Sequence, residues 1–330
     1  MSKQFVCMSP NGEVYAYTIR NSKGMEATVL NMGGIIQSLL VPVNGELRDV
    51  VIGFDLTDAW LNNRAYFGAM VGRNSNRIVN VPFMLGGREV VLTDNNGGKQ
   101  LHGGFNNFSC KVWNVEEKGN ALVLTGISPD GEEGFPGNVE LKVTYTLEED
   151  NALRLEYEAK TDRDTVINLT NHSYFSLGGG CSVAEHSLWI AADYYTEDEG
   201  QLPTGRILPV AGTCYDFRTE KTMGRDMDDP MLARNRGFDI NFCLNGEGFR
   251  KIAELKSADL TMEAYTDTRC VQLYSTSLSK PMQGKKTYEG QCFVCLETQG
   301  YPDCVHHENF PSNIVKAGET YTQTTVYRFK

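Results

Sequence analysis

The sequence lacks the features that mark several common protein classes. No apolar run approaches the roughly 18 residues that a membrane-spanning helix needs. The N-terminal segment MSKQFVCMSP has only one short apolar stretch, Phe5 to Met8, which is too short for the core of a signal peptide. Lys and Arg number 31 against 42 Asp and Glu, a net charge of −11, so a basic surface for nucleic acid or an anionic membrane is missing. We therefore expect a cytoplasmic protein with neither nucleic acid nor membrane as a partner.

Cysteine occurs nine times, an odd number, without the even framework of a disulfide-rich scaffold. The CxxC at Cys292 and Cys295 lacks the second CxxC or the histidine pair that would complete a zinc site. It lies in the apolar run CFVCLE, where the alternation of a strand would direct the two thiols to opposite faces. We interpret the cysteines as reduced and mostly buried thiols, and we expect no metal.

Motifs for nucleotide and ester chemistry are also missing. The segment GQLPTGR at 200–206 resembles a phosphate-binding loop but lacks its Lys-Ser/Thr end, and no GxGxxG follows a strand. No GxSxG nucleophile elbow is present. His306 and His307 are adjacent, which suits neither strand nor helix ligation of a metal, so we interpret them as a solvated loop pair.

Apolar and polar residues alternate with period two through most of the chain. Residues 139–147 and 153–159 both alternate in this way around a turn at 149–151, which predicts an antiparallel hairpin. Helical periodicity is confined to 55–63 and 219–229, and strands do not alternate with helices. The sequence therefore predicts an all-β fold: one large antiparallel β-sandwich with few short helices, in which residues 1–330 form a single domain.

The segment TVINLTNHSYFSL, residues 165–177, combines an apolar face with an unusual polar face. If it is a strand, Asn168, Thr170, His172 and Tyr174 point to the same side. An uncharged stripe of amide, hydroxyl, imidazole and phenol suits a neutral polyhydroxyl ligand, although strand faces of this kind are also common on a solvated surface.

A second unusual segment is FVCLETQG, residues 293–300. Its one carboxylate, Glu297, stands in an apolar strand, where burial is costly unless the group is paired or used. The alternatives are an internal salt bridge or a general base whose pKa burial has raised. Polar groups also gather in GRNSNRIVN at 72–80, and LHGG at 101–104 follows a histidine with two glycines that allow a close backbone approach.

Taken together, these segments resemble the aldose 1-epimerase, or galactose mutarotase, family. The matching motifs keep the family's order and extend over residues 29–313. They are GR-x-x-NRI at 72–78, LHGG at 101–104, N-L-T-NHSYF-x-L at 168–177, PTG to DFR at 203–218, GFD-x-NF at 237–242, VQ-x-Y at 271–274 and LETQ to NFPS at 296–312. The opening segments LNMGGIIQSLLVP at 30–42 and DVVIGFD at 49–55 are also similar to the family.

The resemblance implies a β-sandwich with a concave sugar-binding face and an isomerase that interconverts the α and β anomers of free aldohexoses such as glucose and galactose without a cofactor. The general acid of the family falls on His172 and the general base on Glu297, which we expect on opposite sides of the sugar ring. The residues that would contact the sugar are Asn76, Arg77, His102, Asp239 and Gln272, with Tyr174 lining the site.

Two departures from the family pattern bear on sugar preference. Ile240 stands where the family often has histidine, and Ser275-Thr276-Ser277 replaces its TGN. Two alternative functions stay open. An epimerase for hexose 6-phosphates would need converging Arg or Lys side chains. A non-catalytic carbohydrate-binding module on the same fold would need neither an acid nor a base.

Overall fold

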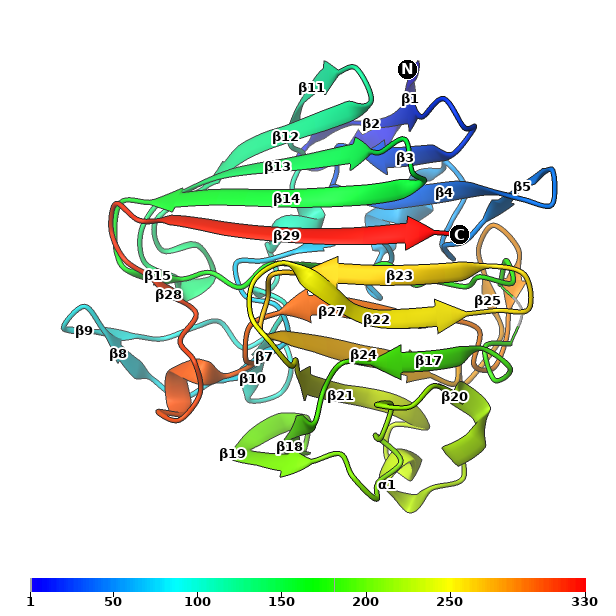
Figure 1. Ribbon diagram of the computed structural model, residues 1–330. Coiled ribbons are helices and arrows are strands. Elements are labelled where there is room, and N and C mark those ends of the chain that lie inside the picture. Colours follow the sequence, from blue (N-terminus) through cyan, green and yellow to red (C-terminus); the bar gives the residue numbers. More distant parts are fainter. Residues whose placement is uncertain (1, 181) are drawn as a thin grey trace.

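The computed structural model describes residues 2–180 and 182–330, and antiparallel sheets dominate it (Figure 1). The largest sheet has nine strands in the order β11-β12-β13-β14-β29-β23-β22-β17-β20. Their bounds are Asn114–Lys118 for β11, Ala121–Ser128 for β12, Val139–Leu147 for β13, Ala152–Thr161 for β14, Thr320–Phe329 for β29, Thr261–Thr266 for β23, Arg250–Lys256 for β22, Ser187–Ile190 for β17 and Lys221–Thr222 for β20.

Two five-stranded sheets lie behind the large sheet in the view of Figure 1. The first has strands β1 Ser2–Ser9, β2 Gly12–Arg20, β3 Glu26–Leu30, β4 Ile36–Val43 and β5 Glu46–Asp49, paired in that order. The second has the order β19 Leu202–Pro209, β18 Tyr194–Glu199, β21 Gly237–Cys243, β24 Cys270–Thr276 and β27 Cys295–Gln299.

Short ladders and helices connect these layers. The two-stranded ladders are β10 Lys99–Leu101 with β7 Arg77–Val79, β15 Thr165–Val166 with β28 Ile314–Val315, β16 Thr170–Asn171 with β6 Met70–Val71, β25 Met282–Gln283 with β26 Thr287–Tyr288, and β8 Phe83–Leu85 with β9 Arg88–Val90. Within the described ranges the helices are α1 Pro230–Ala233 and the 3-10 turns Asp58–Asn62, Phe108–Cys110, Glu132–Gly134, Met223–Asp226 and Cys304–His306. In this part of the chain no helix has the length and apolar character to cross a membrane.

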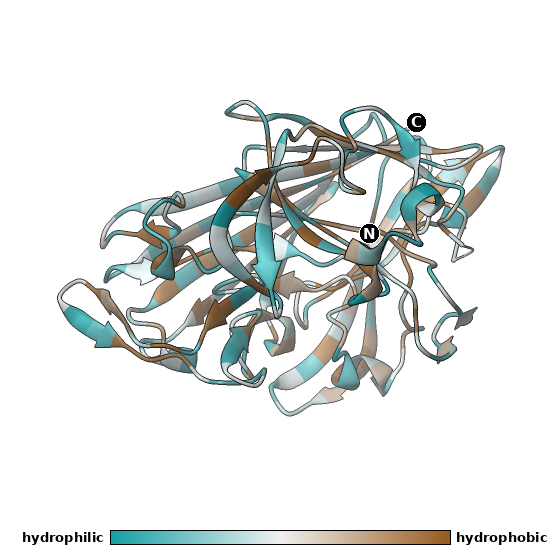
Figure 2. Cartoon of the chain, turned by 90° about the horizontal axis from the view of Figure 1, so that it is seen from below, coloured by the Kyte–Doolittle hydropathy of each residue, from teal (hydrophilic) through white to brown (hydrophobic). Residues whose placement is uncertain are grey.

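The core forms where the inner faces of the sheets meet. Along β13, buried and exposed or half-buried residues alternate, and β13 pairs with β14 in the predicted hairpin, with Val143 opposite Tyr157. Figure 2 shows the same alternation as brown and teal residues along the long strands. The Tyr145 hydroxyl, fully buried, donates a hydrogen bond to the Gly34 carbonyl oxygen at 2.8 Å and so ties the large sheet to the β3–β4 connection. The predicted all-β antiparallel sandwich is confirmed.

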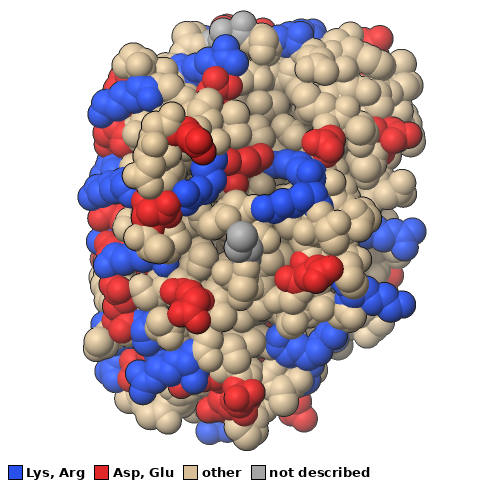
Figure 3. Space-filling view, turned by 90° about the vertical axis from the view of Figure 1, so that its right-hand side faces the viewer, with Lys and Arg blue, Asp and Glu red and all other residues tan. Residues whose placement is uncertain are grey.

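Charged side chains of both signs are interspersed over the face shown in Figure 3. Many of the molecule's charges form ion pairs, such as Arg48 with Asp259 at 2.7 Å and Lys285 with Asp49 at 2.6 Å. The excess of acidic residues therefore does not gather into one uniform field on this face.

The position of β24 between β21 and β27 arranges the functional side chains in rows. Across these three strands Gln272 stands opposite Asn241 on one side and Glu297 on the other. Because side chains directly opposite each other in a sheet share a face, these three residues point to the same side of the sheet. That side carries the candidate site.

Candidate active site

The segment 165–177 is not the single strand that its pattern predicts. Only 165–166 and 170–171 are strands, and the chain between and after them is held by separate contacts, such as the hydrogen bond from the His172 backbone N–H to the Ala69 carbonyl oxygen at 2.8 Å. Asn168, Thr170 and His172 are all buried, so the polar stripe is not a solvated face. The Asn168 side chain accepts a hydrogen bond from the Gly300 backbone N–H at 2.7 Å. The short segments turn because buried polar side chains bind backbone groups in place of a regular ladder.

The centre of the site is a contact between His172 and Glu297, two residues that the sequence analysis selected. His172 Nε2 lies 3.5 Å from Glu297 Oε1, and the two residues are only 5% and 2% exposed. The expectation that they lie on opposite sides of a sugar ring is wrong for this arrangement, because a separation of 3.5 Å leaves no room for a ring between them. Their other polar atoms, His172 Nδ1 and Glu297 Oε2, are buried without a hydrogen-bond partner.

Burial shifts the protonation of the two groups in opposite directions. Loss of solvation, and then the nearby Asp239 carboxylate, raises the pKa of Glu297 to about 8. Loss of solvation lowers the pKa of His172 to about 3. Between these two values the pair holds one proton, and the shifts favour its position on Glu297.

Aromatic rings hold the His172 imidazole in place. The Tyr174 ring is nearly parallel to it, with centroids 4.9 Å apart and an interplanar angle of 13°. The Tyr66 ring is also nearly parallel, at 6.2 Å and 15°. The Tyr174 hydroxyl donates to the Ala65 carbonyl oxygen at 2.7 Å. Tyr174 therefore reaches the site through its ring, while its hydroxyl fastens the chain behind it.

His102 and Asn76 are joined by two reciprocal contacts. The Asn76 backbone N–H donates to His102 Nδ1 at 3.1 Å, and the His102 backbone N–H donates to the Asn76 carbonyl oxygen at 2.9 Å. Since Nδ1 accepts, the neutral ring carries its proton on Nε2. Burial, together with the neighbouring His172, lowers the pKa of His102 well below its usual range. His102 is thus a neutral hydrogen-bond donor beside the acid–base pair.

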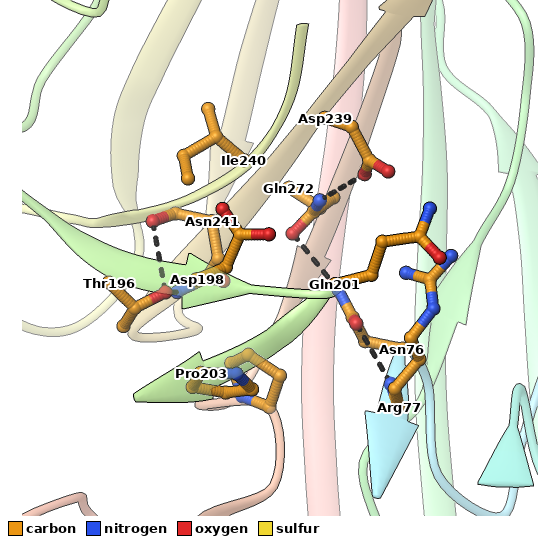
Figure 4. A pocket seen from close by; sticks show the side chains of 11 residues that line it. Asn76, Arg77, Thr196, Asp198, Gln201, Pro203, Asp239, Ile240, Asn241 and Gln272 are labelled. Carbon is orange, nitrogen blue, oxygen red and sulfur yellow. Dashed lines mark hydrogen bonds between the residues drawn. The ribbon is translucent and has the colours of Figure 1, made fainter. Parts of the chain in front are cut away.

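Gln272 links two further predicted residues through its amide (Figure 4). Its Oε1 accepts a hydrogen bond from Asn76 Nδ2 at 2.9 Å, and its Nε2 donates to Asp239 Oδ1 at 2.7 Å. Burial raises the pKa of Asp239, although the Gln272 amide and the Arg77 charge oppose that shift. The three side chains form one continuous hydrogen-bonded row with donors and acceptors in fixed positions.

This row borders a pocket that is open to solvent and encloses about 300 Å³ when the solvent-filled mouth is included. Arg77 lines it with its Nε buried and without a hydrogen-bond partner. The other lining residues are Asn76, Thr196, Asp198, Gln201, Pro203, Asp239, Ile240, Asn241, Gln272 and Pro302. The pocket thus takes in four of the predicted contact residues, whereas His102, Tyr174 and the acid–base pair are not among its lining residues.

The sequence analysis did not identify all the residues that line this pocket. Asn241 stands two residues after Asp239 on β21, so the period of a strand could have identified it. Asp198 and Gln201 come from the β18–β19 hairpin, whose register shifts between Thr196 and Asp198. Such an irregularity breaks the simple alternation, so no pattern in the sequence directs these side chains to the pocket.

Two polar groups singled out in the sequence serve the scaffold. The buried guanidinium of Arg73, in the 72–80 segment, donates to Ser128 and to the carbonyl oxygens of Pro129 and Pro136. His306 is not part of a solvated pair, because its Nδ1 lies 2.7 Å from Asp303 Oδ1 and its side chain is only 17% exposed.

His307 contacts the same carboxylate at 3.8 Å and the Pro203 carbonyl oxygen at 3.1 Å. The interpretation of the two histidines as solvated is therefore wrong. The Asp303 carboxylate contacts both imidazole rings, and the contact of His307 with Pro203 connects the loop at 303–307 to the start of β19.

The sequence predicts reduced, mostly buried thiols and no metal. Cys292 and Cys295 are buried and free, but only Cys295 belongs to β27, so strand alternation does not relate them. Cys181 lies outside the described residues. His102, His172 and Glu297 have ligand atoms within 4.8 Å of one another, a set of donors that a transition metal could accept.

Fold and site together define a class: an enzyme built on an antiparallel β-sandwich, with buried acid and base groups beside a polar pocket. Comparisons with known proteins agree. The sequence profile of the aldose 1-epimerase family matches residues 15–328. The chain is 36% identical to "Aldose 1-epimerase" of Haemophilus influenzae, with 100% of both chains covered, and 38% identical to "Galactose mutarotase" of Mus musculus, covering 97% of this chain and 95% of the relative.

Solved structures give the same result. An aldose epimerase homologue from C. elegans superposes with a TM-score of 0.89 at 29% identity, covering 96% of this chain and 98% of the other. Galactose 1-epimerase from Lactobacillus acidophilus superposes with a TM-score of 0.87 at 26% identity, covering 100% and 98%. The chain belongs to the aldose 1-epimerase family and is an isomerase.

Proposed function

We propose that this enzyme interconverts the α and β anomers of free aldohexoses such as glucose and galactose by opening and reclosing the pyranose ring. The observation that carries the proposal is the buried contact between His172 Nε2 and Glu297 Oε1 at 3.5 Å, beside the hydrogen-bonded row through Gln272. Ring opening needs one proton removed from the C1 hydroxyl and one delivered to the ring oxygen. Both oxygens are bonded to C1, so two groups on one side of the sugar reach them.

Glu297 acts as the general base and His172 as the general acid. As the ring opens, the Glu297 carboxylate takes the proton of the C1 hydroxyl and the His172 imidazolium gives one to the ring oxygen. The C1–C2 bond then rotates in the open aldehyde. Closure on the other carbonyl face reverses both transfers, because Glu297 returns its proton to the carbonyl oxygen and His172 takes one from the C5 hydroxyl.

The shifted pKa values fit this cycle. After ring opening Glu297 is protonated and His172 is neutral, the same state that burial of the two groups favours. The protein therefore favours the protonation state that accompanies the open-chain sugar. The pair holds one proton throughout, so the cycle exchanges no proton with water. The unpartnered Glu297 Oε2 gives a sugar hydroxyl a place to donate, which favours the carboxylate when the closed ring binds.

The surrounding polar groups would hold the pyranose. Asn76, Gln272 and Asp239 present amide and carboxylate groups in fixed orientations, and Arg77 and His102 supply donors. Fixing the hydroxyls places C1 next to the acid–base pair, which lowers the entropic part of the barrier.

The charge of the pocket argues against a phosphorylated sugar. Of the lining residues that the structure describes, Arg77 is the one cationic side chain, whereas Asp198 and Asp239 are acidic. A phosphate would need more than one converging cation. A non-catalytic binding module would have no need for a buried carboxyl with a pKa of about 8 in contact with a buried imidazole.

Polarimetry of freshly dissolved α-glucose and α-galactose tests the proposal. We expect the enzyme to accelerate the approach to anomeric equilibrium, and Glu297→Gln to lower the rate by about 10²–10⁴-fold, since general base catalysis is lost. Glu140→Gln, which removes an exposed carboxylate from β13, is the matched control and should keep the full rate. No acceleration at micromolar enzyme, or acceleration with glucose 6-phosphate alone, would refute the proposal.

A further inference from the structure

Two buried cysteines face each other across neighbouring strands of the site-bearing sheet. Cys243, at the end of β21, stands opposite Cys270, at the start of β24. The next pair along the strands is hydrogen-bonded, since the Leu244 N–H donates to the Arg269 carbonyl oxygen at 2.9 Å. Hydrogen-bonded and non-hydrogen-bonded residue pairs alternate in antiparallel sheets, so Cys243 and Cys270 form a non-hydrogen-bonded pair.

In a non-hydrogen-bonded pair the two side chains lie closer together than in a hydrogen-bonded pair. Its Cα atoms are typically about 4.5 Å apart, and disulfides connect Cα atoms separated by roughly 4.4–6.8 Å. Both thiols are free. The strand register therefore places the two residues where a single disulfide bond can join them.

The two thiols differ in reactivity. A hydrogen bond from the Cys270 thiol, and to a smaller extent one from Tyr301, lowers the pKa of Cys243. Complete burial raises the pKa of Cys270 well above its usual range. Cys243 is 9% exposed and Cys270 is fully buried, so Cys243 is the thiol that a small reagent would meet first as a thiolate.

The pair is also coupled to the pocket. Cys243, Asn241 and Asp239 alternate along one face of β21, and Cys270 and Gln272 do so along β24. The Asn241 side chain lies close enough to the Cys270 thiol to oppose the rise in its pKa. Its Oδ1 also accepts from Gln299 Nε2 at 2.9 Å, and Asn241 lines the pocket.

We propose that Cys243 and Cys270 form a reversible cross-strand disulfide when the protein meets a peroxide, and that this bond weakens sugar binding in the adjoining pocket. The Cys243 thiolate attacks one oxygen of hydrogen peroxide, the O–O bond breaks, and hydroxide leaves, giving a sulfenic acid. The Cys270 sulfur then attacks the Cys243 sulfur and expels a second hydroxide, while its thiol proton goes to water. Two thiols and one peroxide become one disulfide and two waters, and a dithiol reductant reverses the change.

The chemical part of the proposal is tested by peptide mapping, independently of the sugar reaction. The protein is treated with hydrogen peroxide, free thiols are alkylated, and proteolysis is followed by mass spectrometry. We expect a linked pair of peptides carrying Cys243 and Cys270, short by two hydrogen atoms and separated again by dithiothreitol. Cys243→Ser should abolish the link, whereas Cys214→Ser, which removes a buried thiol elsewhere, should leave it intact. Recovery of both peptides alkylated, or of Cys243 as a sulfonic acid without a link, would overturn the proposal.

The second part rests on the proposed function and is tested by KM for the sugar. Oxidised protein should show a KM about fivefold higher, as expected for one lost hydrogen bond at the pocket wall, and dithiothreitol should restore it. The Cys243→Ser protein should show no such rise. A linked protein with unchanged KM would overturn the coupling to the pocket, whereas an inactive reduced protein would refute the proposed function and leave the peptide map to decide on the disulfide.

Discussion

Replacing Glu297 by Gln should stabilise the folded protein above neutral pH while it removes catalysis. The carboxyl has a folded-state pKa of about 8 against an ordinary value of 4.5, and burial is the main cause. Because folding raises this pKa, Glu297 makes its full favourable contribution to the free energy of unfolding below pH 4.5. That contribution is lost as the pH rises through about 8. Gln cannot ionise, so the variant escapes this loss.

The size of the effect follows from the shift. Each pH unit between the unfolded and the folded pKa lowers the free energy of unfolding of the wild type by about 1.4 kcal/mol. His172 is neutral in both the folded and the unfolded chain at pH values well above 6.5, so it adds little slope there. From pH 6.5 to pH 8 the variant should therefore gain about 2 kcal/mol on the wild type, after which the difference levels off.

Urea denaturation of both proteins at a series of pH values measures this difference directly. Glu140→Gln, with its exposed carboxylate, serves as the control and should show no comparable pH dependence. A difference between Glu297→Gln and wild type that stays constant from pH 6.5 to pH 9 would refute the reasoning, because it would mean that Glu297 ionises as easily in the folded chain as in the unfolded one.

Four further outcomes are expected. The kcat/KM measured by polarimetry should be constant from about pH 5 to 7 and fall about tenfold per unit above about 8, where the proton shared by Glu297 and His172 is lost; a profile that rises through pH 8 would contradict the one-proton cycle. Gln272→Ala breaks two hydrogen bonds in the pocket row and should raise KM by roughly 10- to 30-fold with a smaller change in kcat, measured by saturation kinetics. Tyr174→Phe keeps the ring on the imidazole and should leave kcat unchanged, while thermal unfolding shows a loss of about 1–2 kcal/mol. Tyr145→Phe should cost about 1–3 kcal/mol by urea denaturation with unchanged activity, because a buried carbonyl loses its donor and neither residue lines the pocket.

The regular part of the fold could be predicted from the sequence because its strands are half-buried. Alternation identified the hairpin of β13 and β14 and the class of sandwich. It failed at 165–177, where the polar residues are buried and bind backbone groups, so a two-residue period no longer reports which side faces water. Burial of polar groups depends on distant partners, and a local pattern contains no information on them.

The candidate site was found through residue chemistry and family motifs more than through geometry. A carboxylate in an apolar strand led to Glu297, and the contact with His172 agrees with that choice. Gln201 was missed because its place in the pocket depends on an irregular hairpin. The solvated interpretation of His306 failed because Asp303, which holds it, was not recognised as its partner.

Strand β29 has a consequence for how the chain is made. It contains residues 320–329, yet it lies inside the nine-stranded sheet, between β14 and β23. During synthesis on the ribosome, β14 and β23 leave the exit tunnel before β29. Their edges stay unpaired until β29 has been synthesised. Such unpaired edges can pair with other chains, so the nascent protein depends on rapid synthesis of β29 or on chaperones until this strand is inserted. Removing β29 would thus abolish folding of the large sheet, although none of the proposed catalytic or sugar-binding residues lies in it.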